Sequence, residues 1–144
     1  HPRNPILLNN LAYALAADPH TTGEALAMLP QLAGLAATNP AVMDTVAFVH
    51  LRAGNPEKAL ILLNNSMEGN PLGSTVWFQM KVHTAEAQRE IGNPTSALAT
   101  LVEAQAKSRK VPVEDLMTAD RLTEQIQSEL NELRTDGSWR LRWY

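Results

Sequence analysis

Residues 40–63 read PAVMDTVAFVHLRAGNPEKALILL, and this stretch decides the fold. Its apolar side chains recur every three or four positions, as on one face of an α-helix, at Val42, Val46 and Val49. Gly54 stands where helices often end on a left-handed residue, and Asn55–Pro56 follows as a capping side chain before a first helical proline. The stretch therefore predicts two helices, over 40–53 and 56–68, joined by a tight turn.

The same punctuation recurs along the chain. Asn precedes Pro at five places and Asp precedes Pro at one. Each pair can begin a helix, and each closes the preceding one, because the residue before proline resists the α conformation. Thr21 and Glu24 have the spacing of a capping box, which predicts a helix that begins near Thr22. The sequence predicts an all-α chain with helices at 5–17, 22–37, 40–53, 56–68, 74–91, 94–107 and 113–134.

These helices repeat. Ala25 and Ala59 are 34 residues apart, and so are Met43 and Trp77. The run that begins Gly54-Asn55-Pro56 returns 38 residues later as Gly92-Asn93-Pro94. A fixed period of this length is typical of solenoids built from helix pairs.

With these residues the chain resembles the tetratricopeptide repeat (TPR) family. The middle unit meets the family pattern in register at Met43, Val46, Ala47, His50, Ala59, Leu63 and Pro71. The third unit departs from it at Lys81, where the pattern has Gly, and by about four extra residues before Ala97. The resemblance implies an α-α superhelix of three helix pairs, over residues 5–39, 40–73 and 74–108. The Asn-Asn-Leu-Ala-Tyr opening is also similar in style to bacterial repeat proteins, including those of envelope and exopolysaccharide export systems.

The last 36 residues lie outside this pattern and carry 13 charges, against 14 in the first 108. Residues 109–136 predict an amphipathic helix that caps the solenoid, because solenoids need their last apolar face covered. Residues 137–144 form a tail in which aromatic and basic side chains alternate. We expect one structural domain overall. Because the chain opens at His1 without a targeting segment, we expect it to be a piece of a longer protein, cytoplasmic or periplasmic.

The composition of the chain argues against several classes of function. The chain has no cysteine, a net charge of −3 and no apolar run near the roughly 20 residues that cross a bilayer. We therefore expect neither nucleic-acid binding nor membrane insertion. The four histidines, at positions 1, 20, 50 and 83, share no ligand spacing, and no phosphate-binding glycine loop occurs. We predict no catalytic, metal or cofactor site, and a protein that is not an enzyme.

The resemblance implies that the first helix of each pair lines a concave groove that binds a peptide or partner protein. Its contact positions hold Asn9, Asn10, Tyr13, Asp44, Thr45, Phe48, Arg52, Phe78, Gln79 and Val82. Rings supply buried area, and amides can bond a peptide backbone. The alternative is that Tyr13, Phe48 and Phe78 pack between adjacent helices.

The tail offers a second interaction surface. If extended, it places Trp139, Leu141 and Trp143 on one side. We expect the tail to pack on the solenoid of its own chain, and the alternative is that it pairs with a neighbouring subunit or partner. Two functions stay open: a non-catalytic scaffold that binds a peptide in the groove, and a structural unit that assembles through the tail or within a longer repeat array.

Overall fold

The computed structural model describes residues 4–66, 72–108 and 110–135. Within these ranges the chain is all-helical, as predicted, and contains no strand. The predicted helix boundaries agree with the structure to within one residue wherever they fall on these ranges. The helices are α1 (Pro5–Ala17), α2 (Thr22–Ala36), α3 (Pro40–Arg52), α4 (Pro56–Ser66), α5 (Thr75–Glu90), α6 (Pro94–Lys107) and α7 (Val113–Thr135).

Asparagine side chains begin three of these helices. Asn39 Oδ1 accepts hydrogen bonds from the backbone nitrogens of Ala41, at 3.0 Å, and Val42, at 3.4 Å. Asn4 and Asn93 cap α1 and α6 in the same way. Each cap satisfies backbone N–H groups that the first helical turn leaves without partners. Gly54 and Gly92 end α3 and α5 with φ of 86° and 95°, the left-handed conformation expected there.

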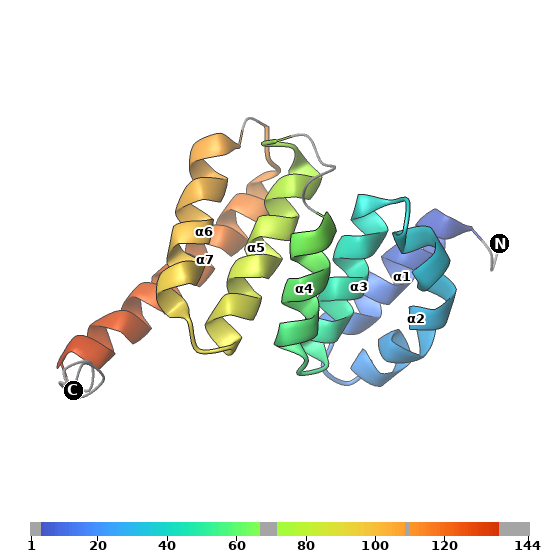
Figure 1. The fold of residues 1–144 in the computed structure, drawn as a ribbon, viewed down its shortest axis with the longest axis horizontal. Coiled ribbons are helices and arrows are strands. Elements are labelled where there is room, and N and C mark those ends of the chain that lie inside the picture. Colours follow the sequence, from blue (N-terminus) through green and yellow to red (C-terminus); the bar gives the residue numbers. More distant parts are fainter. Residues whose placement is uncertain (1–3, 67–71, 109, 136–144) are drawn as a thin grey trace.

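The helices form a row from one end of the molecule to the other (Figure 1). The odd-numbered helices lie side by side, since α1 packs on α3, α3 on α5, and α5 on α7. Each even-numbered helix packs against the two odd-numbered helices that flank it in sequence. The chain is thus a succession of packed helix pairs, in which the odd-numbered helices share one layer.

The core follows this succession. Ala12, Met28 and Val42 belong to a cluster that joins α1, α2 and α3, and Ala16 and Phe48 to a second one between the same helices. A further cluster joins α3, α4 and α5, and another joins α5, α6 and α7. Four alanines of these clusters are fully buried, namely Ala12, Ala47, Ala59 and Ala97. Short side chains there let neighbouring helices approach closely.

Helix α7 covers the last pair. Ala119, Leu122 and Ile126 are buried against α5 and α6, and Leu130 packs on the same cluster. Leu116, one turn before Ala119, is 37% exposed. The last turns of α7 extend beyond the other helices at one end of the row (Figure 1). Among residues 4–66, 72–108 and 110–135, none of the helices has the length and apolarity that a bilayer crossing requires.

Candidate functional site

Three rings from three helices lie together on the layer of odd-numbered helices. Tyr13 stacks on Phe48 with ring centroids 4.4 Å apart, and the Phe48 and His83 rings lie 4.9 Å apart. The three residues follow one another at intervals of 35 residues, so each takes the same place on its helix. Phe48 and His83 are buried, whereas Tyr13 is 40% exposed. The row therefore has a buried floor with one accessible ring above it.

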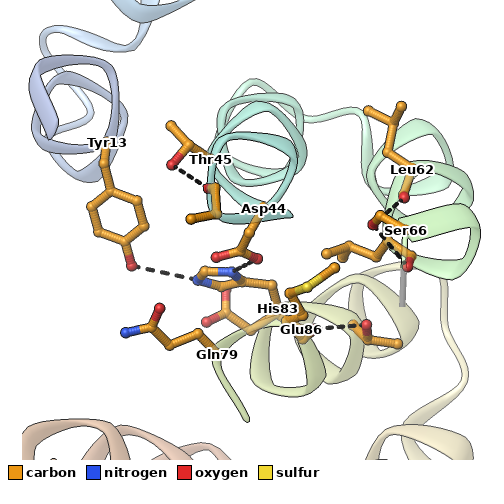
Figure 2. A network of polar contacts seen from close by, with 12 residues as sticks. Tyr13, Asp44, Thr45, Leu62, Ser66, Gln79, His83 and Glu86 are labelled. Carbon is orange, nitrogen blue, oxygen red and sulfur yellow. Dashed lines mark hydrogen bonds and ion pairs between the residues drawn. The ribbon is translucent and has the colours of Figure 1, made fainter. Parts of the chain in front are cut away.

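His83 connects the three helices through hydrogen bonds (Figure 2). Its Nδ1 lies 2.7 Å from Asp44 Oδ1 on α3, and its Nε2 lies 3.5 Å from the Tyr13 hydroxyl on α1. With Nδ1–H donating to Asp44, Nε2 accepts from Tyr13 when the imidazole is neutral and donates to it when the ring is charged. A histidine on α5 thus holds the first two odd-numbered helices in register.

Opposing effects set the pKa of His83. Burial disfavours the imidazolium and lowers the pKa, but the charge and hydrogen bond of Asp44, aided by Glu86, raise it further than burial lowers it. The pKa of His83 therefore lies above its ordinary 6.5. Burial, together with Asp44 and Glu86, raises the pKa of Tyr13 to about 12. The Tyr13 hydroxyl therefore keeps its proton at neutral pH, and the Asp44–His83–Tyr13 row links α3, α5 and α1 through hydrogen bonds.

Arg52 forms the rim of this row. Its guanidinium lies 4.6 Å from the Phe48 ring centroid, a cation–π arrangement. Arg52 Nη1 also donates to Glu86 Oε2 at 2.7 Å, while the arginine side chain stays 34% exposed. The interval between Arg52 and Glu86 is 34 residues, again one repeat. The arginine therefore presents a charge to solvent from a fixed position.

Beyond Arg52 the face continues into a hollow of about 280 Å³ between α3, α5 and α7. Charged and polar side chains line it, since Arg52, Glu86, Arg89, Glu90, Thr118, Arg121 and Gln125 surround one leucine, Leu122. Arg89 Nε donates to Glu129 Oε1 at 2.9 Å, and this bond ties α5 to α7 and lowers the pKa of Glu129. The hollow can take a polar or charged group, and it joins the aromatic row through Arg52 and Glu86.

The ten side chains predicted to contact a ligand divide by exposure. Tyr13, Arg52 and Asn10 are exposed, and Asn9 and Gln79 are half-buried. The other five are buried: Asp44, Thr45, Phe48, Phe78 and Val82.

Each buried member has a packing or bonding role. Phe78 and Val82 belong to the core between α5, α6 and α7. Thr45 Oγ1 donates to the Ala41 backbone oxygen, and Asp44 is engaged with His83. For Phe48 and Phe78, the packing alternative is therefore the one that the structure favours. Asn9 Oδ1 is buried without a hydrogen-bond partner among the described residues.

The prediction missed His83, Glu86 and the α7 residues of the hollow. A signal for the first two exists in the sequence, because His83 stands one repeat after Phe48 and Glu86 one repeat after Arg52. The α7 residues carry no such signal, since α7 lies outside the repeat. The predicted tail residues Trp139, Leu141 and Trp143 lie outside the described residues.

No group of three or more histidine, aspartate or glutamate side chains within the described part of the chain is placed to hold a metal ion. Comparison with family models, with curated proteins and with solved structures gave no match to this chain.

Proposed function

We propose that this chain is a non-catalytic, tetratricopeptide-like module that binds an extended segment of a partner protein. The site is the odd-helix face, which we define by the exposed side chains Tyr13, Arg52, Arg121 and Gln125 together with the half-buried Glu86. The observation that carries the proposal is that Tyr13 and Arg52 stand exposed above a buried, hydrogen-bonded floor.

Side chains that are already held in place favour binding, because they lose less conformational entropy when a ligand binds. Tyr13 is held by its stack on Phe48 and Arg52 by its bond to Glu86. Immobilising a free side chain costs roughly 0.5 to 1.5 kcal/mol on association, and these two are already immobilised. Tyrosine and arginine are also the residue types that most often dominate binding energies at interfaces.

The shape of the face suits an extended segment. The accessible groups run from α1 across α3 and α5 to the hollow beside α7. A ligand that follows this line meets a ring at Tyr13, a cation at Arg52 and a polar hollow. We therefore expect the bound segment to place an apolar or aromatic side chain on Tyr13, and an acidic or polar one near Arg52 and Arg121.

Peptide selection against the immobilised chain tests this proposal. A random library of peptides about twelve residues long would be selected, and the Kd of the best binder measured by calorimetry. We expect Tyr13→Ala and Arg52→Ala each to weaken binding about tenfold or more, the effect of an anchor residue. Lys58→Ala is the matched control, because Lys58 is exposed on the even-numbered helix α4.

The proposal fails if no peptide binds, or if binders keep their affinity in both variants. Circular dichroism of each variant checks that the helices persist. Equal weakening by Lys58→Ala would place the binding surface elsewhere.

One observation favours the second candidate function, a structural assembly unit. Helix α1 carries no charged residue, yet Leu7 and Leu11 are 53% and 50% exposed. Val42, one repeat after Leu7, is buried against α1 and α2. The exposed side of α1 is therefore equivalent to the side of α3 that packs against the preceding helix pair, α1 and α2.

If this side mediates assembly, the mass of the chain measured by light scattering rises with concentration. Leu7→Glu and Leu11→Glu should then keep the chain monomeric at concentrations where the unmodified chain associates. Ile61→Glu is the control, because Ile61 is 60% exposed on α4. A monomer at all concentrations argues against assembly through α1.

A further inference from the structure

A groove separate from the odd-helix face lies between the first turn of α6 and the last turns of α7. Its volume is about 780 Å³, and Asn93, Pro94, Leu98, Gln127, Leu130 and Asn131 line it. Leucine side chains from both helices give it an apolar wall, and three amides surround them. A groove of this size and mixed lining fits bulky rings that also carry a polar group.

The segment that follows α7 in the sequence begins next to this groove. Helix α7 ends at Thr135, and its last two turns form one wall. Residues 136–144 follow directly, so this segment starts at the groove. Nine residues reach about 30 Å when extended, whereas the α7 wall from Gln127 to Arg134 spans about 10 Å. The segment is therefore long enough to return along the whole groove.

The chemistry of the segment matches the lining. Trp139, Leu141 and Trp143 alternate with Arg140 and Arg142. An extended run of this pattern has an apolar side and a basic side. The apolar side suits the leucines, and the amide oxygens of the groove can accept the indole N–H groups.

Charge favours the same placement. Helix α7 carries six acidic and two basic side chains. The segment that follows it carries two arginines and one aspartate. Attraction between the two would hold the segment close to α7.

We infer that residues 139–144 dock into the α6–α7 groove of their own chain, with Trp139 and Trp143 as anchors. This contact covers the apolar wall that α7 presents beyond the α5–α6 turn. It is an interaction of the chain with itself, and it leaves the odd-helix face open.

Disulfide trapping tests the inference directly, because the chain has no cysteine of its own. The double variant Thr95→Cys with Arg142→Cys places one thiol at the groove and one on the segment. Under mild oxidation we expect an intramolecular disulfide, seen by mass spectrometry of the monomer. The control pair, Lys58→Cys with Arg142→Cys, should form it at least tenfold more slowly, because Lys58 is exposed on α4.

Two outcomes would overturn the inference. A disulfide-linked dimer from the Thr95 pair would show that the segment occupies the groove of a second copy. Equal rates for the two cysteine pairs would show that the segment has no preference for the groove.

Tryptophan fluorescence gives an independent measurement on a chain without new thiols. Trp77 is buried, so iodide quenching reports mainly on Trp139 and Trp143. We expect Asn131→Arg, which crowds the groove from an exposed position, to raise the quenching slope at least twofold. Ser128→Arg is the control, because Ser128 is exposed on α7 and does not line the groove. Identical slopes for the two variants would contradict docking in this groove.

Discussion

Asp44→Ala is expected to lower the free energy of unfolding by about 3 kcal/mol, measured by urea denaturation. Removing one partner of a buried, hydrogen-bonded ionic pair typically costs about 3 to 5 kcal/mol. The lower end applies here, because His83 can release its proton once the carboxylate is gone. Both side chains are nearly inaccessible, at 5% and 7% exposure, so water cannot replace the lost bond.

Asp44→Asn separates charge from hydrogen bonding. The amide oxygen can still accept from His83 Nδ1–H, so we expect a loss of only about 1 kcal/mol relative to the unmodified chain. Glu57→Ala is the matched control, because it removes an exposed carboxylate from the first turn of α4. If Asp44→Ala and Glu57→Ala lower the free energy of unfolding equally, the buried Asp44–His83 pair stabilises the fold no more than an exposed carboxylate does.

The pair also predicts a pH dependence with a definite sign. Because the folded-state pKa of His83 is raised, the stabilisation from its charge is complete below about pH 6.5 and is lost as pH rises through the folded pKa. The difference in unfolding free energy between the unmodified chain and Asp44→Asn should therefore shrink from about pH 6 to about pH 9. A constant difference across that range would mean that His83 is neutral throughout.

The contribution of His50 to stability has the opposite pH dependence from that of His83. Burial, with Lys58 nearby, lowers the pKa of His50. Its contribution is therefore present above about pH 6.5 and lost as pH falls towards the lowered pKa. Because His50 is present in both chains, its contribution cancels in the difference between the unmodified chain and Asp44→Asn.

Gly73→Ala is expected to cost about 3 kcal/mol in the same denaturation experiment. Gly73 has φ of 80°, which costs an L-residue about 1 to 2 kcal/mol. A β-carbon there would also clash with the backbone oxygen of Lys107, which no side-chain rotation can relieve. The turn before α5 and the end of α6 would have to move apart, next to the core cluster that α5, α6 and α7 share.

Gly54→Ala is the matched control for the clash. Gly54 also has a positive φ, 86°, but a β-carbon there meets nothing within 4 Å. We expect it to cost only the conformational part, about 1 kcal/mol. Equal losses for the two glycines would show that the turn at Gly73 moves aside without cost.

The sequence predicted the helices closely because their ends are encoded locally. Asparagine, proline and glycine act within one turn of their own position, so no tertiary information is needed to place α1, α3 or α6. The capping box at Thr21 and Glu24 was wrong in its details. The Thr21 hydroxyl donates to the backbone oxygen of Leu15 at 2.7 Å instead of capping α2. The turn between α1 and α2 brings the Thr21 hydroxyl within reach of the last turns of α1.

The candidate site was predicted only in part, because it depends on which helices lie side by side. Periodicity places Tyr13, Phe48 and Arg52 on the correct helix faces. It does not show which of these side chains is buried beneath rings from neighbouring helices. Burial of Phe48 depends on Tyr13 and His83, which are contributed by two other helices. The hollow needs α7, whose position follows from packing on α5 and α6 and from no repeat.

The successive core clusters have a consequence for how the molecule opens. Each cluster joins only three consecutive helices, so α1 and α2 can separate from the row while α5, α6 and α7 stay closed. In such a chain, unfolding starts at the ends, and amide exchange in the outer helices reports on local opening. A ligand that bridges Tyr13 on α1 and Arg52 on α3 would close that end. Its binding would therefore slow exchange in α2, a helix that it never touches.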